Sequence, residues 1–241
     1  MTEVKICGIT NREDALAAVH AGADALGFIF YPKSQRYIVP ERAKEIIQKI
    51  PGSIGKVGVF VNQEIQAVKE IASFCGLRLI QLHGDESLQY CAQFPRSTLI
   101  KTVSHCADEE IQRLKNYPVK AVLVDAHEPS RYGGTGKKSD WALASKVKET
   151  HPLILAGGLN KENIRSAIEI VRPCAVDINS GVETWPGRKD LYKIREIMEI
   201  IRATDDKILA DMPDEPEIPG RRRGRRPAAP PAEAVPVAPV Q

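Results

Sequence analysis

The sequence predicts an α/β fold: a single-domain (βα)8 TIM barrel formed by residues 1–204, followed by a tail at 205–241. Eight short apolar runs alternate with amphipathic segments throughout the first part. Continuous apolar runs are typical of strands that are buried on both faces of a parallel sheet. A strict alternation of strand and helix, repeated eight times in about 200 residues, favours a closed barrel over the alternative, an open doubly wound sheet.

The candidate strands and helices follow one another in order. The strands are predicted at residues 4–7, 25–30, 56–61, 78–82, 98–103, 120–125, 152–156 and 174–178. Asn11 stands just before one helical segment and Pro40 lies just inside the beginning of the next, and both are helix start signals. Residues 162–171 and 191–202 carry apolar residues at three- and four-residue spacing, which indicates amphipathic helices.

The composition excludes several classes of protein. Of the 241 residues, 43% are hydrophobic and 27% are charged, as in a globular protein. No run approaches the roughly 18 apolar residues of a membrane-spanning helix, and Met1 leads into a strand rather than a signal peptide. A cytoplasmic protein without membrane partners is therefore expected. The five cysteines are scattered without CxxC spacing, which favours free thiols over a disulfide framework or a zinc site.

Residues 205–241 differ from the rest of the chain. They lose the helical periodicity, are rich in Pro and Ala, and contain the basic run RRRGRR at 221–226. This composition predicts a disordered segment, to which no catalytic role is assigned. The arginines could contact nucleic acid or an acidic partner. The net charge of the whole chain is only +3, which favours the simpler interpretation that they keep the tail solvated.

Two side chains at predicted strand ends are candidates for proton transfer. Functional residues of such barrels lie where strands end, on the C-terminal face. Cys7 ends the first predicted strand and Asp125 ends the sixth. A cysteine is more often a small buried hydrophobe, but at a barrel mouth near a phosphate-binding positive field its pKa could be lowered, so that it works as a thiolate. Facing a carboxylic acid, it would complete an acid and base pair that moves protons without a cofactor.

The last two units carry a predicted phosphate site. Gly157 and Gly158 follow the seventh strand, and Asn160 is placed to cap the next helix, so that backbone N–H groups can face an anion. After the eighth strand, Ser180 and Glu183 have the spacing of a capping box that would begin a short extra helix. Each feature alone is more often a tight turn or a cap. Barrels often bind phosphate with these two loops, so their joint occurrence favours phosphate.

Three other features leave alternatives open. Arg36 follows the second strand, where it could hold a carboxylate bidentately or simply be solvated. His83 could be an acid or base, a metal ligand or a wall of the pocket, and the last is favoured. The glycine-bearing loop at 131–141 could fold over a substrate or be plainly flexible.

Several motifs match one known family. They are KICGIT at 5–10, PKSQRYI at 32–38, GVFVN at 58–62, QLHGDE at 81–86, VDA with GGTG at 124–136, LAGGL at 155–159, and SGVE with PGRKD at 180–190. In this order, and over nearly all of residues 3–203, the chain resembles phosphoribosylanthranilate isomerase of tryptophan biosynthesis. The resemblance implies a cofactor-free Amadori rearrangement of N-(5-phosphoribosyl)anthranilate to 1-(2-carboxyphenylamino)-1-deoxyribulose 5-phosphate.

The resemblance also implies roles for individual residues. Cys7 would be the general base, Asp125 the general acid, and Arg36 the partner of the anthranilate carboxylate, while the GG and SG turns would hold phosphate. The implied substrate-binding residues are Arg36, His83, Gly134, Gly157, Gly158, Asp177, Ser180 and Gly181. A monomer that uses neither a cofactor nor a metal is expected.

Two other functions remain as alternatives. Another phosphosugar enzyme of this fold could use Lys101 to form a Schiff base, or His83 and Asp125 to bind a metal. A barrel that serves only as a binding scaffold, with RRRGRR contacting RNA or an acidic protein, is the second alternative. The presence of both Cys7 and Asp125 argues against a pure binder, which has no need of the two together.

Overall fold

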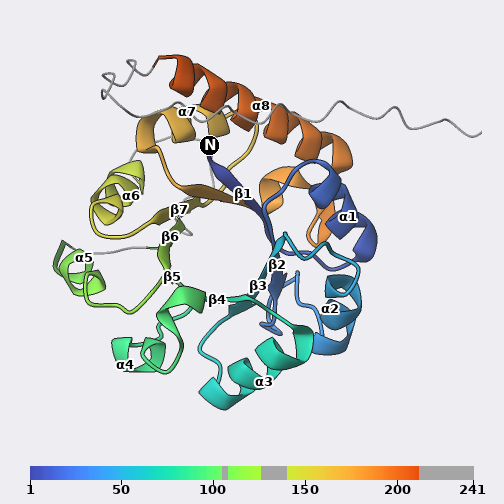
Figure 1. Cartoon of the computed structure of the whole chain (residues 1–241), viewed down its shortest axis with the longest axis vertical. Helices are drawn as coiled ribbons and strands as arrows, with labels where there is room; N and C mark the ends of the chain where they lie inside the picture. Colours follow the sequence, from blue (N-terminus) through green and yellow to red (C-terminus); the bar gives the residue numbers. More distant parts are fainter. Residues whose placement is uncertain (105–107, 126–139, 212–241) are drawn as a thin grey trace, which may run out of the picture.

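The structure is a computed structural model that describes residues 1–104, 108–125 and 140–211. It contains a closed barrel of eight parallel strands, in which each strand pairs with the next and β8 pairs with β1 (Figure 1). The strands are β1 (Glu3–Ile6), β2 (Ala25–Ile29), β3 (Gly55–Phe60), β4 (Leu79–Leu82), β5 (Leu99–Val103), β6 (Ala121–Asp125), β7 (Leu153–Ala156) and β8 (Ala175–Ile178). Each lies within one residue of its predicted bounds, and closure of the sheet confirms the barrel.

Helices surround the strands as an outer ring (Figure 1). They are α1 (Arg12–His20), α2 (Pro40–Ile47), α3 (Ile65–Cys75), α4 (Leu88–Cys91), α5 (Asp108–Leu114), α6 (Asp140–Lys148), α7 (Ile164–Val171) and α8 (Leu191–Ala210), with a 3-10 turn, η1, at Arg96–Thr98. As predicted, Asn11 caps α1 by accepting a 2.8 Å hydrogen bond from the Asp14 backbone N–H, and Pro40 lies in the first turn of α2. Within the described ranges, no helix is long and apolar enough to cross a membrane.

Side chains of the barrel strands alternate between the interior and the helix-facing surface, because strands have a period of two. The interior holds a separate apolar cluster formed by Val57, Ile100, Ala121, Leu123, Ile154, Ala156 and Ala175. Leu123 of β6 belongs to this cluster, so Asp125, two residues further on, faces inward at the C-terminal end. Ile6 of β1 packs in the larger cluster beneath the helices. Its neighbours Lys5 and Cys7 therefore face inward.

A short structure after β8 differs from the prediction. The 3-10 turn η2 (Ser180–Val182) is followed by β9 (Glu183–Trp185), which pairs antiparallel with β10 (Arg188–Lys189). The predicted capping box is wrong, because no side chain of the described residues caps η2. The Glu183 carboxylate is instead buried in ion pairs. The hairpin strands are too short to give a periodic sequence pattern, so the sequence did not reveal them.

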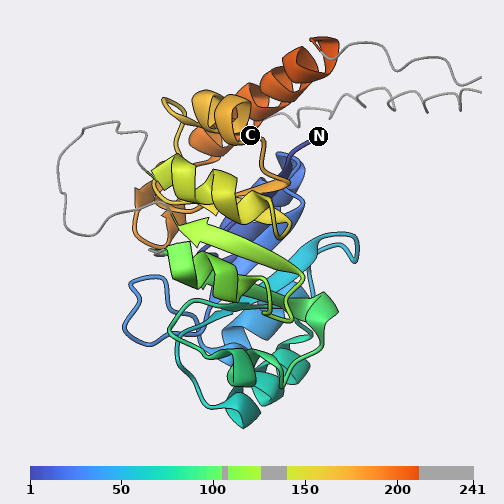
Figure 2. The same ribbon diagram turned by 90° about the vertical axis from the view of Figure 1, so that its left-hand side faces the viewer.

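The C-terminal helix α8 is longer than predicted and holds the start of β1. Buried Asp205 accepts hydrogen bonds of 2.7 Å from both the backbone N–H and the hydroxyl of Thr2. Arg202 donates a 2.9 Å bond to the Thr2 carbonyl, and α8 lies beside the N-terminus in two views (Figure 1 and Figure 2). The predicted division between 1–204 and 205–241 therefore falls inside a helix, and the tail from residue 212 onward lies outside the described residues.

We expect Asp205→Ala to destabilise the barrel by about 1–3 kcal/mol, since it leaves the buried Thr2 donors without an acceptor. The urea unfolding midpoint measures this loss. The matched control is Asp206→Ala, one residue further along α8, where the side chain is exposed. The control should change the stability by less than about 0.5 kcal/mol. Equal midpoints for the two variants would show that this contact does not hold the first strand.

Candidate active site

Two predicted residues lie at the same end of the barrel. Cys7 directly follows β1, and its backbone N–H donates a 2.9 Å hydrogen bond to the Ile178 carbonyl at the end of β8. Asp125 is the last residue of β6. Cys7 is 4% exposed, whereas the Asp125 side chain is 27% exposed. The C-terminal mouth thus carries a buried thiol on one strand and an accessible carboxylate on another.

A buried ion pair lies next to Cys7 in the barrel interior. Lys5 Nζ is 2.8 Å from Asp177 Oδ2, and the pairing of β1 with β8 sets these two residues side by side. A Cβ atom on Gly27 would lie 2.7 Å from Cys7 Sγ and 3.0 Å from Lys5 Nζ. The thiol and the ammonium therefore pack against the same glycine, whose missing side chain leaves the space that both occupy.

Burial determines the protonation of this thiol. It raises the pKa of Cys7, and the Asp177 carboxylate raises it further, although the Lys5 ammonium acts in the opposite direction. For Lys5, burial alone lowers the pKa, but its contacts with Asp177 and, to a lesser degree, Cys7 outweigh burial, so the pKa of Lys5 is raised. The lysine is charged and the thiol is protonated at neutral pH. The expectation of a lowered pKa for Cys7 is therefore wrong in this structure, because desolvation and Asp177 outweigh the nearby positive charge.

His83 lies in the wall of the mouth, beside Asp125. Its Nε2 is 3.5 Å from Asp125 Oδ2. Its Nδ1 lies 3.0 Å from Gln81 Nε2 and 3.3 Å from Thr102 Oγ1. An imidazole whose Nδ1 accepts a hydrogen bond from the Gln81 amide carries its proton on Nε2, facing the carboxylate. This arrangement suits a residue that orients Asp125.

The loops after β7 and β8 pack against each other. Gly157 and Gly158 have positive φ angles of 89° and 60°. A Cβ atom on Gly181 would collide with the carbonyl oxygen of Leu159, so only glycine permits this contact between the two loops. In the part of the chain that the structure describes, the backbone N–H groups of Gly157 and Gly158 after β7, and of Ser180 and Gly181 after β8, donate no hydrogen bond. Four donors are thus available to an anion where phosphate is predicted.

Asn160 fixes the loop that carries the two glycines. Its Oδ1 accepts hydrogen bonds from the backbone N–H groups of Glu162 at 3.0 Å and of Asn163 at 3.2 Å. The helix α7 begins one residue later, at Ile164. The predicted capping role of Asn160 therefore applies to the turn that leads into α7 rather than to the first turn of the helix itself.

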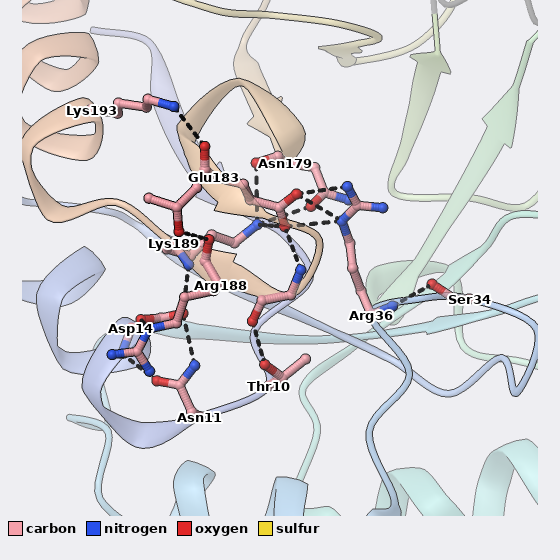
Figure 3. A network of polar contacts seen from close by, with 12 residues as sticks. Thr10, Asn11, Asp14, Ser34, Arg36, Asn179, Glu183, Arg188, Lys189 and Lys193 are labelled. Atoms are coloured by element: carbon pink, nitrogen blue, oxygen red, sulfur yellow. Dashed lines mark hydrogen bonds and ion pairs between the residues drawn. The ribbon is translucent and has the colours of Figure 1, made fainter.

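Arg36 is held at the mouth by a carboxylate of the protein. Its Nε and Nη2 donate to Glu183 at 2.6–3.2 Å, and Lys189 Nζ lies 2.8 Å from the same carboxylate (Figure 3). The Arg36 side chain is 20% exposed. Of the two predicted alternatives for Arg36, the structure contradicts simple solvation.

The sequence pattern does not reveal three charged residues of this site. It predicts no role for Lys5 or Lys189, and it predicts a cap for Glu183. A signal for Lys5 was present, because a lysine inside a buried strand, two residues before Cys7, must face the same side as the thiol. Glu183 and Lys189 carried no such signal, since their contacts depend on a hairpin with two-residue and three-residue strands.

The remaining predicted residues are placed as follows. Gly134 and most of the loop at 131–141 lie outside the described residues. Lys101 is buried and pairs with Glu86, its Nζ lying 2.9 Å from the Glu86 carboxylate. Among the residues that the structure describes, no group of three His, Cys, Asp or Glu side chains could hold a metal ion.

The chain is similar to known proteins over nearly the whole of its barrel. The family model for N-(5'phosphoribosyl)anthranilate (PRA) isomerase matches residues 4–200. An N-(5'-phosphoribosyl)anthranilate isomerase from Syntrophus aciditrophicus is 52% identical over 202 residues, which cover 84% of this chain and 88% of the relative. The protein of the same name from Geobacter metallireducens is 49% identical, and the match covers 84% of this chain and 100% of the relative.

Solved structures give the same result. Phosphoribosyl anthranilate isomerase from Thermotoga maritima has a TM-score of 0.76 at 45% identity, over 84% of this chain and 100% of that chain. A phosphoribosyl anthranilate isomerase in complex with reduced 1-(o-carboxyphenylamino)-1-deoxyribulose 5-phosphate has a TM-score of 0.74 at 42% identity, with the same coverage. Since the family model and these relatives match nearly the whole barrel, the chain belongs to the N-(5'-phosphoribosyl)anthranilate isomerase family.

Proposed function

We propose that this protein catalyses the Amadori rearrangement of N-(5'-phosphoribosyl)anthranilate to 1-(2-carboxyphenylamino)-1-deoxyribulose 5-phosphate in tryptophan biosynthesis. The observation that carries the proposal is a buried thiol, Cys7, and an accessible carboxylate, Asp125, at the mouth of a barrel of this isomerase family. The rearrangement shifts protons between neighbouring atoms of one sugar, so it needs an acid and a base at one site.

Asp125 is the general acid in this mechanism. In its acid form it donates a proton to the ribose ring oxygen, the bond from that oxygen to C1 breaks, and the lone pair of the anthranilate nitrogen forms an iminium with C1. The carboxylate left behind has the His83 ring 3.5 Å away. A group with access to the mouth suits this step, because the ring oxygen must come within hydrogen-bond distance of the acid.

Cys7 is the general base. The thiol first releases its own proton to solvent; the thiolate then removes the proton from C2, the C–H electrons form a C1–C2 double bond, and the iminium becomes a neutral enolamine that tautomerises to the ketone. Since burial raises the pKa of Cys7, the thiolate needs a nearby positive charge to form. Lys5 supplies one such charge, and the iminium formed in the preceding step supplies a second.

The rest of the site binds the two ends of the substrate. The proposed phosphate donors are the backbone N–H groups of Gly157, Gly158, Ser180 and Gly181. Arg36 binds the anthranilate carboxylate, and the sugar hydroxyls lie between His83 and Asp177, whose Oδ1 is buried and accepts no hydrogen bond among the described residues. Gly134 stays a proposed contact.

We also propose that the protein acts as a monomer in the cytoplasm. A solved structure of monomers generated from the dimeric Thermotoga maritima isomerase matches with a TM-score of 0.73 at 41% identity. Light scattering of the purified chain distinguishes the two states. The chemistry above uses residues of one chain only, so neither state changes the assignment of acid and base.

Cys7→Ala and Asp125→Asn should each lower kcat by at least about a hundredfold, because each removes one proton-transfer group. The fluorescence of the anthranilate adduct follows turnover. Cys174→Ala is the matched control: this exposed thiol lies just before β8, at the opposite end of the barrel, and its loss should leave kcat unchanged. A near-normal rate in either site variant removes that residue from the mechanism.

The rate of Cys7 alkylation by iodoacetamide should respond in opposite directions to two substitutions. Asp177→Asn removes a charge that raises the pKa of Cys7, so alkylation at pH 8 should become faster. Lys5→Met removes a charge that lowers the pKa, so alkylation should become slower. Mass spectrometry of the Cys7 peptide measures both rates, with Cys174 as the internal reference. Equal rates in the two variants would show that the ion pair does not control the thiol.

Removal of residues 212–241 should leave kcat/KM within about twofold of the full chain, because α8 and every proposed site residue precede the cut. The cut is placed after Asp211, since removal from residue 205 would also delete the Thr2 contact of α8. A tenfold or larger fall in turnover would instead assign the tail a part in the catalytic function.

A further inference from the structure

Glu183 lies at the centre of a buried group of charges beside the mouth. One carboxylate oxygen, Oε1, accepts from Arg36 Nε at 2.9 Å, from Lys189 Nζ at 2.8 Å and from the Gly187 N–H at 3.2 Å. The other, Oε2, accepts from Arg36 Nη2 at 2.6 Å. Lys189 Nζ also donates to the Asn179 side chain at 2.9 Å. Figure 3 shows Glu183 between the arginine and the lysine.

These contacts fix one edge of the Arg36 guanidinium and leave the other edge available. Glu183 takes Nε and Nη2, which form the side-on face of the group. The remaining nitrogen, Nη1, has no hydrogen-bond partner within the described ranges and points away from Glu183 (Figure 3). A guanidinium is planar, so holding two of its nitrogens also sets the direction of the third.

The arginine stem lies against the residue that follows the proposed base. A Cβ atom on Gly8 would lie 2.8 Å from Arg36 Cδ and 2.7 Å from Asn179 Oδ1. Gly8 follows Cys7 directly and has a φ of 74°, a conformation that favours glycine. Arg36 therefore crosses the turn after β1, against Gly8, and a β-carbon at residue 8 would displace it.

The three charged side chains of this group have a net positive charge that one more anion would neutralise. Arg36 and Lys189 carry two positive charges and Glu183 one negative charge. Burial alone raises the pKa of Glu183, but hydrogen bonds from Arg36 and Lys189 outweigh it, so its pKa is lowered and the carboxylate is ionised. The surplus of one positive charge is balanced when a single carboxylate binds at Nη1.

We propose that Glu183 is a positioning residue that makes the site selective for a substrate whose aromatic ring bears a carboxylate. It does so by holding Arg36 along one edge, so that Nη1 faces the place where that carboxylate binds. The inference rests on the proposed function, because it concerns the anthranilate end of the same substrate. It goes beyond the role of Arg36, since it assigns the direction of the arginine to a second residue that touches no substrate.

The affinities of two probes distinguish a positioning role of Glu183 from a merely structural one. The first is reduced 1-(o-carboxyphenylamino)-1-deoxyribulose 5-phosphate, and the second is the same compound without the ring carboxylate. Calorimetry gives the Kd of each. The wild-type protein should bind the carboxylated probe at least about tenfold more tightly, since a charge-assisted contact to arginine is lost in the other.

Glu183→Gln should reduce this preference about tenfold or abolish it, while the Kd of the probe without carboxylate stays within about twofold. The amide offers one acceptor oxygen, for which Arg36 and Lys189 compete, so Arg36 loses its fixed direction. Glu196→Gln, an ion-paired glutamate on α8, is the matched control and should keep the full preference. If Glu183→Gln does not fold, Glu183→Asp decides instead, because the shorter side chain cannot reach both arginine nitrogens.

The outcomes are distinct. If the folded Glu183 variant keeps the preference of the wild-type protein for the carboxylated probe, the positioning role is overturned but the proposed function stays intact. An equal loss of affinity for both probes shows that Glu183 only supports the hairpin, and also overturns it. A wild-type protein that binds neither probe and does not turn over the anthranilate adduct overturns the proposed function, and this inference falls with it.

Discussion

Closure of the barrel between β1 and β8 is the constraint on which the site depends. This pairing sets Lys5 beside Asp177 and joins the end of β1 to the end of β8 through the Cys7 N–H. A buried ion pair gives little net stability, because the desolvation of both charges offsets their attraction. Its consequence here is electrostatic: the pair is neutral overall, yet its two charges act on the Cys7 thiol in opposite directions.

The segment after β8 completes the mouth by connecting loops that are distant in sequence. The Lys189 N–H donates a 2.7 Å bond to Asp14 of α1, and the Gly187 carbonyl accepts one of 2.6 Å from Thr10. Glu183 of the same segment holds Arg36 from the loop after β2. A hairpin of five strand residues thus fixes the first two loops of the barrel relative to the last. Arg36 and the loop that follows Cys7 are thereby held by one small structure.

The sequence predicted the strands closely and the charges of the site poorly, for one physical reason. A strand that is buried on both faces must be apolar over its whole length, so its bounds are visible locally. The direction of Arg36 depends instead on Glu183, a residue 147 positions away. The spacing of Ser180 and Glu183 suggested a cap, but tertiary ion pairs outcompete a local hydrogen bond. Likewise, α8 continues past residue 204 to a contact between Asp205 and Thr2, which no local pattern reveals.

The raised pKa of Cys7 implies an order of events in the proposed mechanism. A thiol that is protonated in the resting site cannot remove a proton from C2 before the sugar ring opens. Protonation of the ring oxygen by Asp125 creates an iminium, and this positive charge lowers the cost of forming the thiolate beside it. The thiolate therefore forms most readily at the stage when the C2 proton has become acidic. Until then, the buried and protonated thiol is a poor nucleophile, which protects both the residue and the sugar from side reactions.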